Sequence, residues 1–364
     1  MIKHSDHFHG SDLETIEKIY GIKKEDIISF SANVNPLGIS PKLKATLAEK
    51  IDAIMTYPDR EYSSLRSCIA DYVKTDMDNI IVGNGSTELI SLFIQIKNPR
   101  KALILGPTYS EYEREVSLGG GSTLYYPLDE ENDFQLDILS LEKELTSEID
   151  LLIICNPNNP TSSSITRSDM RHILDACKIK GIFVMVDETY VEFAEDTSKI
   201  TSIPLTNYYN NIIILRGISK FFAAPGLRLG YAICGNRDLL KEMNQRKNPW
   251  TINSLAAIAG ELMFTDEDYI KETRSMIGKE RDRIMFILKS NKNIRCYPPR
   301  ANFLLIKILK DGISSMDIFE AAIKKGLLIR DCSSFPFLDN RFIRFCFMNP
   351  KDNDALLEVL QSLL

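Results

Sequence analysis

The fold is decided by the stretch Ile182-Phe183-Val184-Met185-Val186-Asp187-Glu188-Thr189-Tyr190, in which five apolar residues are followed at once by acidic and hydroxyl side chains. A continuous apolar run of this length is typical of a strand that is buried on both faces, as in a parallel sheet. Ligands of open α/β sheets bind beside the carboxyl ends of the strands. The stretch therefore predicts a buried strand that ends at a functional site.

Similar apolar runs occur at residues 102–105, 151–155 and 212–215, and a helical pattern at Ser168–Lys180 separates two of the runs. This alternation predicts an α/β fold, with a mainly parallel sheet sandwiched by helices. After about Gly235 the pattern changes to two helical stretches, two strand-like runs and two further helices. We therefore expect a large domain at residues 48–250, and linking helices and a small α+β C-terminal domain at 251–364. Residues 1–47 look irregular and are expected to pack on the small lobe.

Composition excludes several classes of protein. The chain has 364 residues, of which 44% are hydrophobic and 26% charged, as in ordinary soluble proteins. The net charge of −6 disfavours non-specific binding to nucleic acid. No apolar run approaches the roughly 18 residues that span a membrane, and the first residues lack the apolar core of a signal peptide. The seven cysteines are scattered without a Cys-x-x-Cys pair, so we expect a cytoplasmic protein without structural metal.

Polar clusters stand where ligand-binding loops are expected. Asn156–Thr161 follows one apolar run, and Arg216–Lys220 follows another, with Pro225–Gly230 shortly after it. Gly83–Glu88 opens a predicted helix ahead of the run at residues 102–105. Taken alone, Asn-Pro-Asn-Asn-Pro is most simply a turn and Gly-Asn-Gly-Ser-Thr a helix cap. The order and spacing of the clusters together give the pattern its specificity.

This combination resembles the fold-type I pyridoxal-phosphate enzymes of the class I and II aminotransferase superfamily. The resemblance implies pyridoxal 5'-phosphate as cofactor, with Lys220 forming a Schiff base and Asp187 pairing with the pyridinium nitrogen. Tyr190 and Asn159 would then hydrogen-bond the phenolic oxygen of the ring. The remaining cofactor-binding residues implied are Gly85, Ser86, Thr87, Ser219 and Arg228 around the phosphate, Tyr109 stacked on the ring, and Tyr57.

Within the superfamily, the chain is similar to threonine-phosphate decarboxylases and to histidinol-phosphate aminotransferases. Phe30–Gly38, Asn248–Ala257 and Arg300–Phe303 resemble the decarboxylases more closely, whereas His9-Gly10-Ser11-Asp12 departs from their pattern of a second glycine followed by asparagine. The resemblance thus implies decarboxylation of L-threonine O-3-phosphate to (R)-1-aminopropan-2-yl phosphate in cobalamin biosynthesis. The alternative is a histidinol-phosphate type of aminotransferase that uses 2-oxoglutarate.

An acidic protein must bind such a substrate, a phosphorylated amino acid or amino alcohol, with local cations. Arg344 matches the superfamily arginine that binds a substrate acid, and Arg330 is expected to join it. The resemblance adds His9, Asn33 and Asn302 as substrate-binding residues. It also implies a homodimer in which Tyr57 reaches the neighbouring cofactor phosphate. Trp250 is expected to pack beside a helix rather than to line the site.

The choice between the two reactions is geometric. The bond that breaks is the one perpendicular to the cofactor ring, and the sequence shows ligands without angles. A catalytically inactive scaffold is disfavoured, because Lys220, Asp187, Tyr190 and Arg228 are all present. A Rossmann dehydrogenase is disfavoured because no Gly-x-Gly-x-x-Gly follows an early strand.

Overall fold

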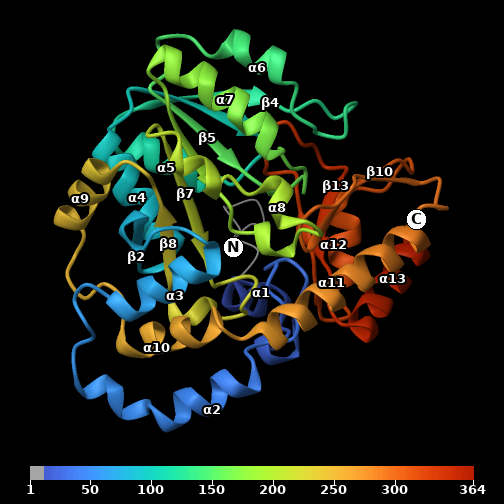
Figure 1. Cartoon of the computed structure of the whole chain (residues 1–364). Helices are drawn as coiled ribbons and strands as arrows, with labels where there is room; N and C mark the ends of the chain where they lie inside the picture. Colours follow the sequence, from blue (N-terminus) through green and yellow to red (C-terminus); the bar gives the residue numbers. More distant parts are fainter. Residues whose placement is uncertain (1–11) are drawn as a thin grey trace.

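The computed structural model describes residues 12–364 and is built around a seven-stranded sheet (Figure 1). The strand order is β2-β8-β7-β6-β5-β3-β4, and only β8 runs antiparallel to its neighbours. This result confirms the predicted mainly parallel sheet. The strands are β2 (Ile80–Gly83), β3 (Lys101–Gly106), β4 (Ser122–Pro127), β5 (Leu151–Cys155), β6 (Phe183–Asp187), β7 (Ile212–Gly217) and β8 (Gly230–Ile233).

Helices cover both faces of this sheet, and successive strand residues pack on opposite sides. Ile153 belongs to the core cluster formed with α4, α5 and α9, whereas Ile154 belongs to the cluster that contains α6 and α7. Because both of their faces are buried, the central strands are continuous apolar runs in the sequence. The helices around the large sheet are α3 (Ser63–Val73), α4 (Gly85–Lys97), α5 (Glu111–Leu118), α6 (Ile138–Glu144), α7 (Arg167–Lys180), α8 (Thr197–Ile200), α9 (Arg237–Arg246) and α10 (Ser254–Met263).

The C-terminal part forms a second, antiparallel sheet of order β12-β13-β10-β9, which lies with α12 and α13 on one side of the large sheet (Figure 1). The long helix α11 (Glu267–Leu288) leads into it. The elements are β9 (Ile294–Cys296), β10 (Phe303–Ile308), α12 (Ser315–Ile323), β11 (Leu327–Leu328), β12 (Arg330–Asp331), β13 (Phe342–Cys346) and α13 (Pro350–Leu363).

The N-terminal segment is more regular than its sequence suggested. It contains α1 (Leu13–Tyr20), β1 (Ile28–Ser29) and α2 (Pro41–Glu49), and β1 pairs in parallel with β11 of the C-terminal part. Both helices are short and rely on local caps: the side chain of Asp12 accepts from the backbone of Thr15, and Ser40 accepts from Leu43. Caps of this kind stabilise short helices, which form poorly on their own.

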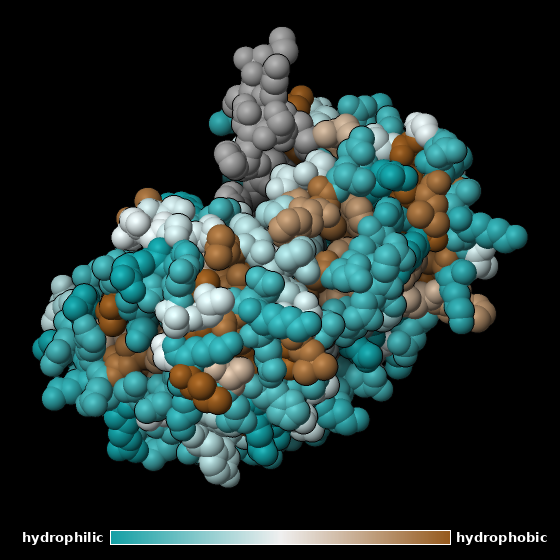
Figure 2. Space-filling view, turned by 90° about the horizontal axis from the view of Figure 1, so that it is seen from above, coloured by the Kyte–Doolittle hydropathy of each residue, from teal (hydrophilic) through white to brown (hydrophobic). Residues whose placement is uncertain are grey.

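Short 3₁₀ helices complete the chain at η1 (Lys24–Asp26), η2 (Ile51–Met55), η3 (Met77–Asn79), η4 (Val191–Phe193), η5 (Ile203–Asn207) and η6 (Pro225–Leu227). Within residues 12–364, no helix is long and apolar enough to cross a membrane. Figure 2 shows a face on which hydrophilic residues predominate and hydrophobic residues form separate patches.

Candidate functional site

The ends of β5, β6 and β7 are fastened to one another by backbone hydrogen bonds. The amide of Asn156 donates to the carbonyl of Asp187 at 2.8 Å, and the amide of Glu188 donates to that of Leu215 at 2.9 Å. The loops that carry the predicted cofactor residues therefore leave the sheet along one edge. This is the position at which an open α/β sheet binds its ligands.

Asp187 is the last residue of β6, and its carboxylate is buried. One carboxylate oxygen accepts from the hydroxyl of Tyr112 at 2.7 Å, and the other accepts from the amide and the hydroxyl of Thr189 at 2.9 and 2.6 Å. Burial raises the pKa of Asp187, and the hydrogen bonds from Thr189 and Tyr112 oppose that rise. The result is a fixed carboxylate that lacks a cationic partner among the hydrogen bonds of the described residues.

Lys220 follows β7 and is half-buried beside the strand ends. Its ammonium group donates to the backbone carbonyl of Ala32 at 2.7 Å. Burial, and then the positive charge of Arg344, lower the pKa of Lys220 to about 8. An amine with a lowered pKa is neutral in a larger fraction of molecules at neutral pH, which is the state that attacks an aldehyde.

The first turn of α4 and the Arg228 guanidinium form a cradle for an anion. Gly85, at the first position of α4, has a φ of 77°, and a Cβ added there would lie 2.6 Å from Nη2 of Arg228. A Cβ on Gly230 would lie 2.3 Å from the backbone nitrogen of Ser86. Both positions therefore require glycine, so that the guanidinium and a neighbouring strand can approach the helix N-terminus, where phosphate binds readily.

Two tyrosines predicted to touch the cofactor lie close to these groups. The Tyr109 ring packs edge-on against Tyr112, with centroids 5.6 Å apart. Burial, with smaller effects of nearby carboxylates including Asp187, raises the pKa of Tyr109 to about 12. Tyr190 is buried, its hydroxyl accepts from Nδ2 of Asn33 at 3.4 Å, and its ring packs edge-on against Phe303.

Arg344 and Arg330 lie directly opposite each other on β13 and β12. Arg344 is buried and donates to the carbonyl of Ser31 at 2.7 Å and to the side-chain oxygen of Asn159. Arg330 donates to the Ser334 hydroxyl at 2.9 Å, and burial together with repulsion from Arg344 lowers its pKa. The pairing of these two residues on adjacent strands places two cationic side chains in one region, which favours binding of an anion.

The side of the site around Arg330 and Arg344, here called the acid-binding side, also contains buried polar atoms. These atoms have no hydrogen-bond partner in the described part of the chain. They are Nε of Arg344, Oδ1 of Asn33, Oδ1 of Asn302 and the hydroxyl of Ser31. The amide nitrogen of Asn302 donates to the backbone carbonyl of Asn33 at 3.0 Å, so these two residues are held together. Such atoms are costly to bury unless a ligand or water satisfies them. His9 lies outside the described residues.

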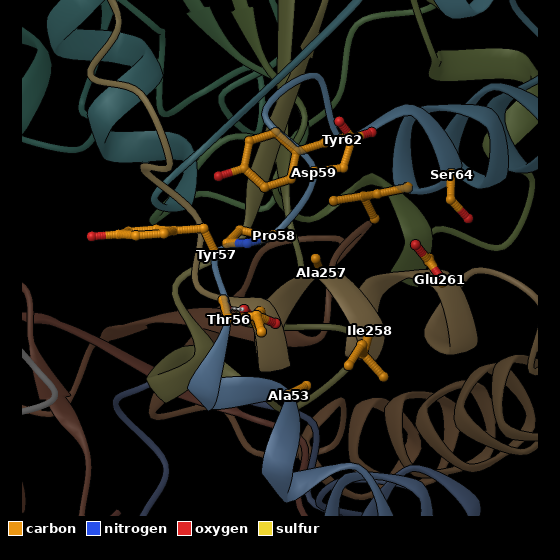
Figure 3. Close-up of a pocket in the computed structure, with 12 residues that line it drawn as sticks. Ala53, Thr56, Tyr57, Pro58, Asp59, Tyr62, Ser64, Ala257, Ile258 and Glu261 are labelled. Carbon is orange, nitrogen blue, oxygen red and sulfur yellow. Dashed lines mark hydrogen bonds between the residues drawn. The ribbon is translucent and has the colours of Figure 1, made fainter.

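Tyr57 is not brought to the strand ends within one chain. Its ring is 78% exposed and packs on Trp250, with centroids 4.8 Å apart. Trp250 itself is 42% exposed, so it is less buried than its expected packing role required. A cavity of about 220 Å³ lies between η2, α3 and α10, and the Tyr57 ring points away from most of its other lining residues (Figure 3).

Several residues of the site were not singled out from the sequence. Tyr112 and Thr189 hold Asp187, while the backbones of Ser31 and Ala32 accept from Arg344 and Lys220. Thr189 follows Asp187 by two residues, which is a detectable spacing for a carboxylate-capping hydroxyl. The contacts of Ser31 and Ala32 use backbone carbonyls and have no signature in the sequence.

The donor set fits pyridoxal phosphate. An amine of lowered pKa suits the aldehyde, a buried carboxylate suits the pyridinium nitrogen, and a helix N-terminus with a guanidinium suits the phosphate. Lys220, Asp187 and the α4 turn with Arg228 would hold these three parts of the group. Ser219 lies in the loop of Lys220, Thr87 lies in the first turn of α4, and Ser86 packs beside Gly217.

A model of the family "Aminotransferase class I and II" matches residues 25–360. The chain belongs to this family. A Caldanaerobacter subterraneus protein provisionally named as a threonine-phosphate decarboxylase is 38% identical over 91% of this chain and 89% of its own length. The Salmonella typhimurium threonine-phosphate decarboxylase is 33% identical over 98% of this chain and 96% of its own length. The structure of a Clostridium acetobutylicum histidinol-phosphate aminotransferase matches 92% of this chain and 98% of its own, with 33% identity and a TM-score of 0.85.

Proposed function

We propose that the protein is a pyridoxal-phosphate-dependent decarboxylase that converts L-threonine O-3-phosphate into (R)-1-aminopropan-2-yl phosphate and carbon dioxide. The resemblance of the sequence places this reaction in cobalamin biosynthesis. The observation that carries the proposal is the pair of cross-strand arginines, Arg330 and Arg344, of which Arg344 acts on the charge of the Lys220 amine. The 38% and 33% identical decarboxylases support it.

Each group of the site has a chemical task in this proposal. Bound pyridoxal phosphate supplies an electron sink for the carbanion that loss of carbon dioxide leaves. Asp187, whose carboxylate is fixed by Tyr112 and Thr189, would keep a proton on the ring nitrogen. Lys220 would hold the group and would return a proton to Cα as an ammonium. The two arginines hold the acid groups of the substrate.

The orientation of the substrate would decide which bond breaks. If Arg330 and Arg344 bound the phosphate, the substrate carboxylate would be left free, and the bond from Cα to the carboxylate would be the one to break. The electron pair of that bond would be taken up by the electron sink until a proton from Lys220 is returned to Cα. When Arg344 binds the carboxylate in the ring plane, the Cα–H bond is the upright one, and transamination follows.

Transamination is the second candidate. It is favoured by the similarity to the histidinol-phosphate aminotransferase structure, which covers 92% of this chain with a TM-score of 0.85. Every residue assigned above would serve that reaction too. A serine-phosphate decarboxylase would also use the same groups, since one methyl group changes specificity by only about 1–3 kcal/mol.

We also propose a homodimer in which Tyr57 approaches the cofactor phosphate of the neighbouring subunit. Several large apolar side chains near it are exposed in the single chain, namely Ile51, Ile54, Met55 and Trp250. Exposed apolar patches of this kind mark interfaces in soluble proteins. The division into residues 1–47, 48–250 and 251–364 belongs to the same proposal, with the arginines carried by the small domain.

Product analysis tests the proposed reaction. The loaded protein is incubated with L-threonine O-phosphate and no keto acid, and the products are identified by mass spectrometry. Aminopropanol phosphate and carbon dioxide support the decarboxylase. No turnover there, together with glutamate formation from histidinol phosphate and 2-oxoglutarate, would replace it with the aminotransferase.

A further inference from the structure

Residues 30–35, here called the strap, run between the Lys220 loop and the C-terminal sheet. Four successive backbone carbonyls of the strap accept hydrogen bonds from the site or its support. Those of Phe30, Ser31, Ala32 and Asn33 accept from the amide of Cys346, from Arg344, from the Lys220 ammonium and from Asn302, at 2.9, 2.7, 2.7 and 3.0 Å. The strap therefore touches both the proposed imine-forming lysine and the proposed acid-binding arginine.

Asn35 fixes one end of the strap to the lysine loop. Its backbone amide donates to the carbonyl of Lys220 at 2.9 Å, and its side-chain nitrogen donates to the carbonyl of Phe221 at 2.8 Å. The same nitrogen lies 2.9 Å from the Tyr269 hydroxyl and 2.8 Å from that of Thr273, both on α11. Asn35 is 2% exposed, so these bonds are shielded from water.

Inside the strap, Asn33 has a backbone geometry that few residues adopt. Asn33 has a φ of 55°, in the left-handed region, where asparagine is one of the tolerated residues. Its carbonyl is held by Asn302, and its side chain reaches the Tyr190 hydroxyl. The carbonyl of Ala32, directly before Asn33 in the strap, thus has a defined direction toward Lys220.

The Lys220 amine is surrounded by opposing influences. Burial is the main influence that disfavours its positive charge, and Arg344 of β13 and Arg228 add to it, whereas Cys346 and Asp187 of β6 favour the charge. The Ala32 carbonyl also favours the charged form, because it accepts the hydrogen bond. A small displacement of the loop changes the balance among these groups.

We propose that Asn35 is a positioning residue that, through the strap, holds the Lys220 amine among Arg344, Arg228 and the Asp187 carboxylate. It acts on Lys220 through the backbone and touches neither cofactor nor substrate. The inference rests on the proposed function, in which Lys220 forms the imine, but it concerns the lysine alone. It can therefore be tested without substrate.

The test measures Lys220 in the full-length protein from which the cofactor has been removed. Acetic anhydride labels the amine over a range of pH, and the peptide that contains Lys220 is quantified by mass spectrometry. In the unaltered chain the labelling midpoint should lie near pH 8, from the lowered pKa of about 8. In Asn35→Ala the loop admits water and the midpoint rises by about one pH unit, which slows labelling at pH 7 about tenfold.

Asn35→Ser is the second variant, in case alanine prevents folding, and the same shift is expected. Thr273→Val is the matched control, because it removes one partner of Asn35 but leaves the bonds to Lys220 and Phe221. It should lower the melting temperature without moving the midpoint. An unchanged midpoint in both folded Asn35 variants would overturn the proposal. Failure of the decarboxylase assay with an intact midpoint shift would instead contradict the proposed function alone.

Discussion

The two halves of the candidate site differ in how well their polar groups are satisfied. At the strand ends of the large sheet, both oxygens of Asp187 accept hydrogen bonds and the α4 turn is tightly shaped by glycines. On the acid-binding side, Nε of Arg344, Oδ1 of Asn33 and Oδ1 of Asn302 are buried without a partner in the described residues. Among the described residues, the buried polar groups named in the first half have hydrogen-bond partners and those named in the second half do not.

This difference indicates which half sets the reaction. A satisfied, rigid half can bind the same cofactor in every member of the family, since its groups keep their geometry. Nε of Arg344 is a donor that an acid group of the substrate can satisfy, whereas Oδ1 of Asn33 and Oδ1 of Asn302 are acceptors and need an N–H or O–H donor. In the proposed function, the substrate and the bond that breaks would therefore depend on Arg330, Arg344 and the strap.

The largest effect is expected from Lys220→Ala, which removes the covalent partner from the rigid half. Product formation should fall by at least about 10²–10⁴-fold, because proton transfer to Cα is lost as well. Borohydride reduction followed by mass spectrometry should find no cofactor attached to the chain.

Lys247 provides a matched control for that variant. Burial lowers its pKa to about 8 as well, but its ammonium donates to the carbonyl of Val82 rather than facing the strand ends. Lys247→Met should keep the reducible imine. Loss of the imine in Lys247→Met and its survival in Lys220→Ala would show that the wrong lysine has been assigned.

The next effect comes from the unsatisfied half. Arg344→Lys should lower kcat/KM about 10²-fold, since charge-assisted hydrogen bonds contribute about 1.5–3 kcal/mol and lysine cannot replace a fork of donors. Cofactor absorbance should be unchanged. Arg341→Lys is the control, because Arg341 is an exposed partner of Asp339 on the same strand connection. Equal kinetics for the two variants would remove Arg344 from the substrate site.

A smaller effect concerns the stability of the cofactor-free protein. Burial raises the pKa of Asp187, so the ionised carboxylate destabilises the folded state above the folded pKa, and the penalty vanishes below the unfolded pKa. Asp187→Asn should therefore raise the melting temperature at pH 7, on a scale of roughly 2–4 °C per kcal/mol. The gain should disappear as the pH falls toward 4.

With pyridoxal phosphate added, the unaltered chain should have a higher melting temperature than Asp187→Asn. The cofactor is expected to stabilise the unaltered chain more than Asp187→Asn, because only the carboxylate pairs with the ring nitrogen. Calorimetry with and without cofactor measures both effects. If Asp187→Asn without cofactor is less stable than the unaltered chain at every pH, the ionised Asp187 carboxylate does not destabilise the folded state.

The smallest effect is expected from Tyr57→Phe, which removes one hydroxyl from the neighbouring site of the proposed dimer. Release of the cofactor on dialysis should accelerate by a factor of about 5, the value of one neutral hydrogen bond of about 1 kcal/mol. Tyr208→Phe, another exposed tyrosine, should have no effect. Equal release rates for both variants would argue against the crossing role of Tyr57.

The difference between the satisfied and the unsatisfied half of the site also explains which residues could be predicted from the sequence. The apolar runs and the residues that follow them located Asp187, Lys220 and the α4 turn, because strand periodicity and loop position are local properties. The parallel sheet and the two C-terminal strands with their helices were likewise predicted. The roles of these residues in the site remain predictions, and the structure adds their hydrogen bonds and burial.

The unsatisfied half depends on contacts that are distant in sequence. Arg344 meets Asn159 and Ser31, which are 185 and 313 residues away along the chain. The strap acts through backbone carbonyls, which carry no sequence signature, and the left-handed φ of Asn33 is set by its surroundings. Trp250 was expected to be packed, but size alone does not show which face of a loop an aromatic residue occupies.

A competition experiment tests the central claim most directly. The loaded enzyme receives equal concentrations of L-threonine O-phosphate and histidinol phosphate, with 2-oxoglutarate present, and carbon dioxide and glutamate are measured in the same vessel. We predict that carbon dioxide and aminopropanol phosphate form in equal amounts and that glutamate is a minor product. Glutamate formation without carbon dioxide would contradict the account and show that Arg344 binds the substrate for transamination.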